Sequence, residues 1–199
     1  MNVYRDLNTL PHFEHTAITV GSFDGVHFGH QMVLGQLLEI AEQKFLTPIL
    51  ITFDPHPQEV LFPESCIRML NSIEEKIEQL EKIGIPNLVI VPFNSQFANI
   101  SAQDYICEFL VKYFHPSVIL LGHDHHFGKN RTGNMDLLKS MSESCQYDVV
   151  QIPAYLIEEM AVSSSRIRKL ISSGHIAEAN KLLGYKYQLN GLVIKGDQI

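Results

Sequence analysis

The strongest constraint on the fold is the alternation of short apolar runs with helical patterns along the 199 residues. Apolar, β-branched runs predict strands at Ala17–Gly21, Pro48–Phe53, Asn87–Pro92, Val118–Gly122 and Val149–Ile152. Periodic apolar positions predict helices at Gly29–Gln43, Ser72–Ile83, Ser101–Tyr113, Asn134–Ser144, Ser163–Ser172 and His175–Leu183. Repeated strand–helix alternation predicts an α/β protein with a Rossmann-like, doubly wound parallel sheet whose strands are covered on both faces.

Composition limits the classes of protein to consider. The formal net charge is −7, so a broad basic surface for nucleic acid is not expected, although a small anionic ligand needs only a few converging basic groups. The three cysteines, Cys66, Cys107 and Cys145, have neither zinc nor disulfide spacing, which favours thiols in a reducing compartment. Because no apolar run has the length of a membrane helix and the N-terminus lacks a signal-peptide core, we expect a cytoplasmic protein without membrane partners.

A glycine-rich decapeptide, Gly-Ser-Phe-Asp-Gly-Val-His-Phe-Gly-His, follows the first predicted strand at residues 21–30. Its glycines let the backbone approach a ligand closely, and the following helix begins with free N–H groups and a partial positive charge. His27 and His30 can donate hydrogen bonds to phosphate oxygens. The glycine spacing is not that of a dinucleotide-binding fingerprint, and no Gly-Lys-Ser/Thr follows. The segment therefore predicts a site for a nucleoside triphosphate.

Two further polar loops follow predicted strands. Asp54-Pro55-His56-Pro57 comes after the second strand, where two prolines stiffen the chain around a histidine. The segment Gly122–Gly133 comes after the fourth strand. Because ligands of parallel sheets bind at the carboxyl ends of the strands, we expect these loops and the decapeptide to form one site.

The run His123-Asp-His-His126 suggests a metal site only at first reading. Adjacent side chains of an extended chain point to opposite faces, so one ion would not reach all four. A dedicated transition-metal site is therefore not expected.

A second phosphate-binding element is predicted at Val162–Arg168, where three serines open a helix that carries Arg166 and Arg168. Serine hydroxyls and free N–H groups suit an anion, although the same pattern fits a capped helix with solvated basic residues. The glutamates at 74, 75, 78 and 81 are interpreted as a solvated helix face.

Gly-x-Phe-Asp-Gly-Val-His-x-Gly-His resembles the HxGH signature of the nucleotidyltransferase superfamily, and in its extended form that of the bacterial FAD synthetase family. The resemblance continues through Phe53–Pro57, Gly122–Gly133 and Val162–Arg168, in the family's order. It implies the nucleotidyltransferase fold and an FMN adenylyltransferase module, which transfers AMP from ATP to FMN and gives FAD and pyrophosphate. Mg²⁺ would be bound through the ATP phosphates, without metal ligands from the chain.

The resemblance also implies roles for individual residues. Catalysis is expected from His27, His30 and Arg168. ATP binding is expected from Gly21, Ser22, Phe23, Asp24, Gly29, Asp124, Ser164 and Ser165, with Asp24 helping to place the metal ion or the loop. FMN binding is expected from Asp54, Pro55, His56, Pro57, Phe127, Gly128 and Arg131. The chain departs from the family pattern at His125, where an aromatic residue is usual, and at His126, where arginine or threonine often stands.

The resemblance divides the chain into an adenylyltransferase domain at residues 1–183 and a second part at residues 184–199. The latter is either a tail strand or a linker and the truncated start of a riboflavin kinase-like domain. The kinase signature Pro-Thr-Ala-Asn is absent from the sequence, so riboflavin phosphorylation is not expected. Two alternatives stay open: transfer to another phosphorylated acceptor such as phosphopantetheine, and a flavin- or nucleotide-binding module with little turnover.

Overall fold

The computed structural model describes residues 1–122, 125–152 and 162–193. The described residues contain one six-stranded sheet in the order β1-β4-β3-β2-β5-β6, in which every neighbouring pair is parallel. The strands are β1 (Asn2–Tyr4), β2 (Thr16–Val20), β3 (Thr47–Asp54), β4 (Asn87–Pro92), β5 (Pro116–Gly122) and β6 (Asp148–Ile152). The predicted doubly wound parallel sheet is confirmed.

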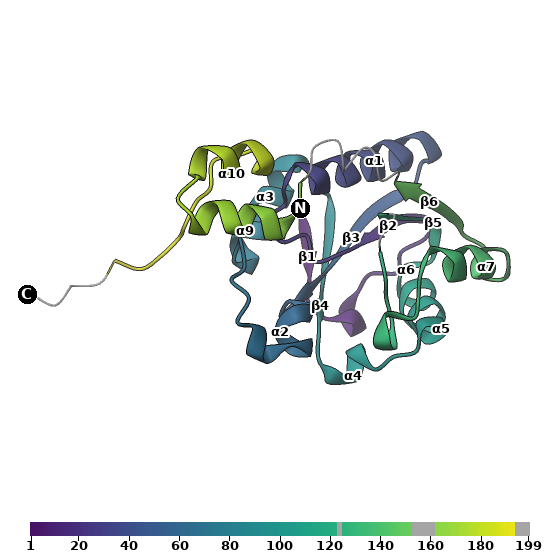
Figure 1. Cartoon of the computed structure of the whole chain (residues 1–199). Coiled ribbons are helices and arrows are strands. Elements are labelled where there is room, and N and C mark those ends of the chain that lie inside the picture. Colours follow the sequence, from purple (N-terminus) through teal and green to yellow (C-terminus); the bar gives the residue numbers. More distant parts are fainter. Residues whose placement is uncertain (123–124, 153–161, 194–199) are drawn as a thin grey trace, which may run out of the picture.

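Helices cover both faces of this sheet (Figure 1). The helices are α1 (Phe28–Lys44), α2 (Pro57–Leu61), α3 (Ile73–Ile83), α4 (Ser95–Ala98), α5 (Ala102–Asp104), α6 (Lys112–Phe114), α7 (Met135–Cys145), α9 (Ser164–Ser172) and α10 (Ile176–Leu183). A π-helical segment, Tyr105–Val111, joins α5 to α6. Among the described residues, none of these helices has the length and apolar character needed to cross a membrane.

Alternate strand residues supply two separate cores. On β2, Ile18 and Val20 pack with the layer formed by α5, the π-helical segment and α7. Ala17, the residue before Ile18, packs with α1 and α3 on the other face. All five residues of β2 are buried, because a central parallel strand is covered on both sides.

Each predicted strand and helix is present, with ends that move by at most two residues. Sequence analysis missed β1, because a strand of three residues has no measurable periodicity. It also read Pro57 as part of a loop, whereas this proline opens α2 and His56 caps that helix.

The structure corrects one prediction about α3 and bears on the segment after α10. The prediction of a solvated acidic face on α3 was wrong for Glu75, which is buried and accepts hydrogen bonds from the N–H groups of Ser72 (2.9 Å) and Asn190 (3.0 Å). The described residues after α10, 184–193, form no strand, so a tail strand is not seen there.

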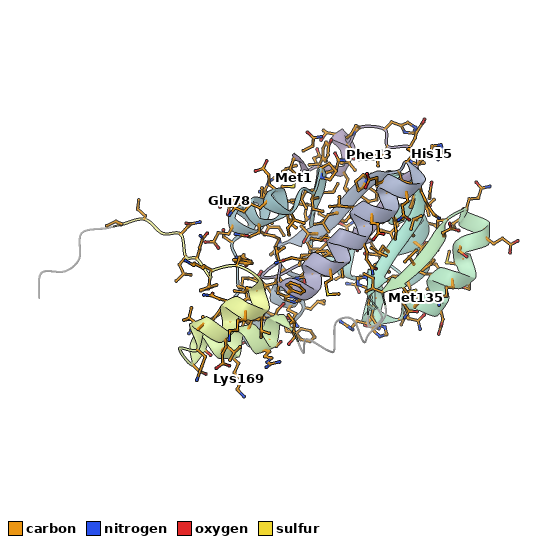
Figure 2. The ribbon with its side chains drawn as sticks, turned by 90° about the horizontal axis from the view of Figure 1, so that it is seen from above. Met1, Phe13, His15, Glu78, Met135 and Lys169 are labelled. Atoms are coloured by element: carbon orange, nitrogen blue, oxygen red, sulfur yellow. The ribbon has the colours of Figure 1, made fainter. Side chains whose placement is uncertain are left out.

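The direction in which successive strands are added to the sheet reverses between β2 and β5. The chain runs outward from β2 through β3 to β4 with α1 and α3 on one face, then crosses β2 to β5 and β6 with its helices on the other. Figure 2 shows His15, which precedes β2, and Lys169, on α9, at opposite ends of the molecule. The α9–α10 pair therefore lies toward the carboxyl edge of the sheet, where ligands bind in this type of fold.

Two glycine-to-alanine changes should have opposite effects on stability. Gly35 is exposed in the middle of α1, and an added Cβ would meet nothing within 4 Å. Gly35→Ala should raise the free energy of unfolding by about 0.5–1 kcal/mol, because alanine favours helix over glycine. Gly25 has a φ of +80°, and an added Cβ would lie 2.6 Å from Leu70 Cδ1. Gly25→Ala should lower stability by about 1–3 kcal/mol. Urea denaturation measures both, and effects of equal sign would contradict this account.

Candidate active site

The loop between β2 and α1 follows an unusual backbone path. Phe23, Gly25 and Val26 have φ values of 47°, 80° and 36°. Residues with a Cβ rarely adopt positive φ, so surrounding contacts must hold this loop in shape. Leu70 packs close to Gly25, which explains why a glycine is needed there.

Five consecutive carbonyl oxygens of this loop, those of residues 22–26, accept hydrogen bonds. Ser22 O accepts from Thr52 Oγ1 (3.1 Å) and Lys76 Nζ (2.8 Å). Phe23 O accepts from the N–H of Val26 (3.1 Å). Two of these three donors, Thr52 on β3 and Lys76 on α3, lie far away in the sequence.

The remaining three carbonyls contact side chains. Asp24 O accepts from Ser164 Oγ (2.9 Å), Gly25 O from the Tyr185 hydroxyl (2.7 Å) and Val26 O from Gln31 Nε2 (2.9 Å). The negative ends of these peptide dipoles are thus engaged by the protein. At the start of α1, the N–H groups of Phe28 and Gly29 have no acceptor among the described residues, which leaves donors for an anion.

His27 and His30 form a stacked pair at the start of α1. Their ring centroids lie 3.6 Å apart with an interplanar angle of 14°. His27 caps the helix, since its Nδ1 accepts a hydrogen bond from the N–H of His30 (3.4 Å). This bond assigns the His27 proton to Nε2, which can donate to a ligand. His30 Nδ1 is buried and lacks a hydrogen-bond partner among the described residues.

Both imidazoles are neutral at pH 7. Burial lowers the pKa of His27 to about 4, and the nearby Asp24 carboxylate offsets this only in part. Burial also lowers the pKa of His30 well below 6.5, with further lowering by His27 and Lys76. In the ligand-free protein the pair therefore offers N–H donors rather than positive charges.

Asp24 joins this loop to α9. Its side chain is almost fully buried and accepts hydrogen bonds from the N–H of Leu70 (2.9 Å) and from Arg168 Nη2 in an ion pair. Arg168 Nε also donates to Arg68 O (2.8 Å). The paired imidazoles and the distant guanidinium thus lie on the same side of the molecule. Both Asp24 oxygens are engaged, so its contacts fix the loop.

The serines at the start of α9 have different surroundings. Ser163 caps the helix by accepting from the N–H of Arg166 (3.2 Å), and Ser164 donates to Asp24 O. Ser165 is exposed, and together with Arg168 it lines a cavity of about 360 Å³. Gln58 on α2 and Phe62 just after it also line this cavity.

The Asp54–Pro57 segment is held in a capped turn. His56 Nδ1 accepts from the N–H of Gln58 (3.1 Å), and Glu59 accepts from the N–H of His56 (2.9 Å). Burial lowers the pKa of His56. Asp54 and His56 line a second cavity, of about 330 Å³. Lys76 and Tyr187 line the same cavity.

The loop after β5 gives a different result. The Phe127 ring is only 5% exposed and stacks on Tyr105, with centroids 4.9 Å apart, in the core. The prediction that Phe127 stacks on FMN therefore requires a ring face that the protein itself already covers in this structure. Gly128 lies against Ala102, where a Cβ would approach the Ala102 Cα to 2.7 Å, and Arg131 is exposed. Asp124 lies outside the described residues.

Three residues that hold the site were missed by the sequence analysis: Gln31, Lys76 and Tyr185. Each donates a hydrogen bond to a carbonyl of the 22–26 segment. Gln31 also donates to Leu183 O (2.7 Å), which joins α1 to the end of α10. Nothing in the local sequence marks these residues, because only the folded chain brings them to the loop.

Comparison with known proteins agrees with this arrangement. The family model described as FAD synthetase matches residues 10–166, which is more than half of the chain. The chain belongs to the FAD synthetase family. It is 31% identical over 200 residues to a bifunctional riboflavin kinase/FMN adenylyltransferase of Buchnera aphidicola subsp. Acyrthosiphon pisum, covering 100% of this chain and 64% of that protein. The Listeria monocytogenes protein of the same description is 36% identical over 182 residues, covering 91% and 57%.

The chain thus spans less than two thirds of the length of these relatives. Among solved structures, it is similar to a crystal structure described as a macrolide-efflux protein from Streptococcus pneumoniae. That similarity has a TM-score of 0.79 at 25% identity and covers 93% of this chain and 70% of the other.

The depressed pKa of His27 should make stability depend on pH. The unfolded histidine binds a proton below about pH 6.5, whereas the folded one stays neutral down to about pH 4. The unfolded state therefore binds more protons in this window, and stability falls as the pH falls. His27 should account for a loss of about 2 kcal/mol between pH 7.5 and 5.

Urea denaturation at both pH values tests this account. The His27→Gln variant should lose that much less stability over the interval than the unchanged protein. The exposed His12 provides the matched control, and His12→Gln should leave the pH dependence unchanged. Equal pH dependence in the unchanged protein and in the His27 variant would contradict the account.

Proposed function

We propose that this chain is an FMN adenylyltransferase, which transfers AMP from ATP to FMN and releases pyrophosphate. The observation that carries the proposal is that three separated segments, residues 21–30, 54–57 and 162–168, meet at one edge of the sheet. They do so in a chain of the FAD synthetase family. Asp24, in the first segment, forms an ion pair with Arg168 in the third. His56 lies close enough to Asp24, Lys76 and Arg168 for each to affect its pKa.

The ATP phosphates are assigned to the start of α1 and to the start of α9. His27 Nε2, the free N–H groups at Phe28 and Gly29, and His30 are donors for the α-phosphate region. Arg168 has five N–H donors, of which only two groups, Nη2 and Nε, have partners among the described residues. Together with the exposed Ser165, it can bind the β- and γ-phosphates. Gly21, Ser22 and Phe23, with Asp124, are assigned to the nucleoside.

The FMN site is assigned to the Asp54–Pro57 loop and the cavity beside it. Gly128 and Arg131 stay in the proposal as residues of the loop after β5. Phe127 is proposed to support that loop from the core, since its ring packs on Tyr105.

The chemistry needs no strong general base. An FMN phosphate oxygen, already ionised near neutral pH, attacks the α-phosphorus of ATP. The bond from that phosphorus to the bridging oxygen breaks, and pyrophosphate leaves with its electrons. The barrier is the approach of two anions, so positioned N–H donors and Arg168 should supply most of the acceleration. The neutral imidazoles suit this task, because a nearby polyanion raises their pKa and favours a protonated ring as charge develops.

Mg²⁺ is proposed to arrive with ATP. When bound, it would neutralise phosphate charge through substrate oxygens and water. Among the described residues, no group of three or more His, Cys, Asp or Glu side chains could hold an ion. Asp24 is proposed to hold the loop through its two engaged oxygens rather than to bind the metal.

The division into residues 1–183 and 184–199 is also proposed, with the second part as a linker and the start of a kinase-like domain. A cytoplasmic location is expected and would be tested by cell fractionation. No nucleic-acid partner is proposed, in view of the net charge of −7.

The decisive experiment incubates the protein with ATP, Mg²⁺ and either FMN or riboflavin and identifies products by chromatography. FAD and pyrophosphate should form from FMN in equal amounts, and riboflavin should stay unchanged. Phosphopantetheine replaces FMN in a third reaction. Adenylylation of that acceptor alone would support the first alternative. Flavin binding without any FAD would support a binding module and overturn the proposal.

Two variants should divide the catalytic roles. His30→Ala should lower kcat by about 10²–10³-fold, because it removes a donor to the transferred phosphate, and should change the FMN Kd less than threefold. Arg168→Ala should weaken ATP binding by about 10–100-fold. Steady-state rates and titrations of each substrate provide the values. Lys169, which is exposed on the same helix as Arg168, supplies the control Lys169→Ala. Equal losses of turnover and FMN affinity in His30→Ala would count against its role, and an unchanged ATP Kd would reject that of Arg168.

A further inference from the structure

Lys76 is a buried cation beside the candidate site. It lies on α3, and its side chain reaches the loop after β2, where Nζ donates to Ser22 O at 2.8 Å. The residue is only 6% exposed. Lysine is rarely buried to this extent unless its charge is paired.

No carboxylate compensates this charge at close range. Among the described residues, no Asp or Glu oxygen lies within 4.0 Å of Lys76 Nζ, although Asp24, Asp54 and Glu59 act on it from further away. Burial accordingly lowers the pKa of Lys76. A buried charge costs free energy unless an opposite charge is supplied, and a neutral carbonyl does not supply one.

Lys76 also lines the cavity of about 330 Å³ next to the Asp54–Pro57 loop. The other lining residues include three carboxylates, Asp54, Glu59 and Glu75, and six apolar or aromatic side chains, Phe53, Met69, Leu70, Ile73, Tyr187 and Leu189. The apolar side chains suit the aromatic body of a ligand, and Lys76 supplies a positive charge for its anionic end. Of the three N–H donors of the ammonium group, one contacts Ser22 O, which leaves two for a ligand.

We propose that the Lys76 ammonium group binds the phosphate of FMN and so selects a phosphorylated flavin as the acceptor. The inference rests on the proposed adenylyltransferase function. FMN is favoured over ATP as the ligand of Lys76, because the residues assigned to the β- and γ-phosphates of ATP, Arg168 and Ser165, line a different cavity. Lys76 lies close enough to His30 to affect its pKa. A phosphate bound at Lys76 is therefore near the imidazole assigned to the α-phosphate of ATP, as an attacking group must be.

The test compares two flavins that share a ring system and differ in the phosphate. Lys76→Met keeps the aliphatic length and removes the charge. Flavin fluorescence titration should show FMN binding weakened by about 10–100-fold, because a charge-assisted hydrogen bond to phosphate is lost. Riboflavin binding should change less than threefold, and so should the Kd of ATP. Lys76→Arg should recover at least part of the FMN affinity.

Lys82→Met is the matched control, since Lys82 is exposed on the same helix, and it should leave every Kd unchanged. Circular dichroism checks that each variant is folded, and Lys76→Gln replaces the methionine variant if that variant is not. Equal weakening of FMN and riboflavin would mean that Lys76 only supports the loop, and would overturn the proposal. A larger effect on ATP than on FMN would assign the ammonium to the nucleotide instead, and would also overturn it.

The outcome is separable from that of the proposed function. FAD formation by a Lys76→Met protein that still prefers FMN over riboflavin as strongly as the unchanged chain would refute the Lys76 assignment alone. If the unchanged chain makes no FAD, and Lys76→Met still removes its preference for FMN over riboflavin, the phosphate site is kept and the transferase is refuted.

Discussion

The site depends on the orientation of the peptide groups that follow β2. Five carbonyl oxygens in sequence, at residues 22–26, accept hydrogen bonds from the protein. A carbonyl facing the ligand would repel phosphate, whereas a carbonyl held by a buried donor does not. Positive φ at Phe23 and Val26 would be costly without such contacts. The contacts therefore maintain both the shape of the loop and the sign of its potential.

These contacts explain why α9 and α10 are part of the site rather than an appendage. Ser164 and Arg168 on α9 bind Asp24, and Tyr185 after α10 donates to Gly25 O. Their own small core, with Ile167, Ala179 and Leu183, also includes Leu70 from the segment before α3. The family match ends within α9, at residue 166, yet the chain beyond it fixes the loop that begins 145 residues earlier, at residue 21.

The electrostatics of the site differ from those of the chain as a whole. The protein has a net charge of −7, but Lys76 and Arg168 both donate hydrogen bonds to the loop at residues 22–26. The imidazoles of His27 and His30, which directly follow that loop, are kept neutral by burial. Such an arrangement holds few fixed positive charges in the absence of substrate, and it gains favourable interactions when a polyanion is present.

Much of this could be predicted from the sequence, because it is encoded locally. Alternating apolar runs and helical periodicity determined the parallel α/β sheet, and the loop motifs with their resemblance identified the candidate segments. Sequence reasoning failed where a role depends on distant neighbours. Phe127 resembles a ligand-stacking residue until Tyr105 is found against its ring, and Lys76 and Glu75 resemble surface charges until the loop and Asn190 cover them. Local sequence therefore determined which elements form and which motifs they carry. Only the tertiary structure decided which side chains are buried and what they contact, because burial and hydrogen bonding depend on residues far apart in the chain.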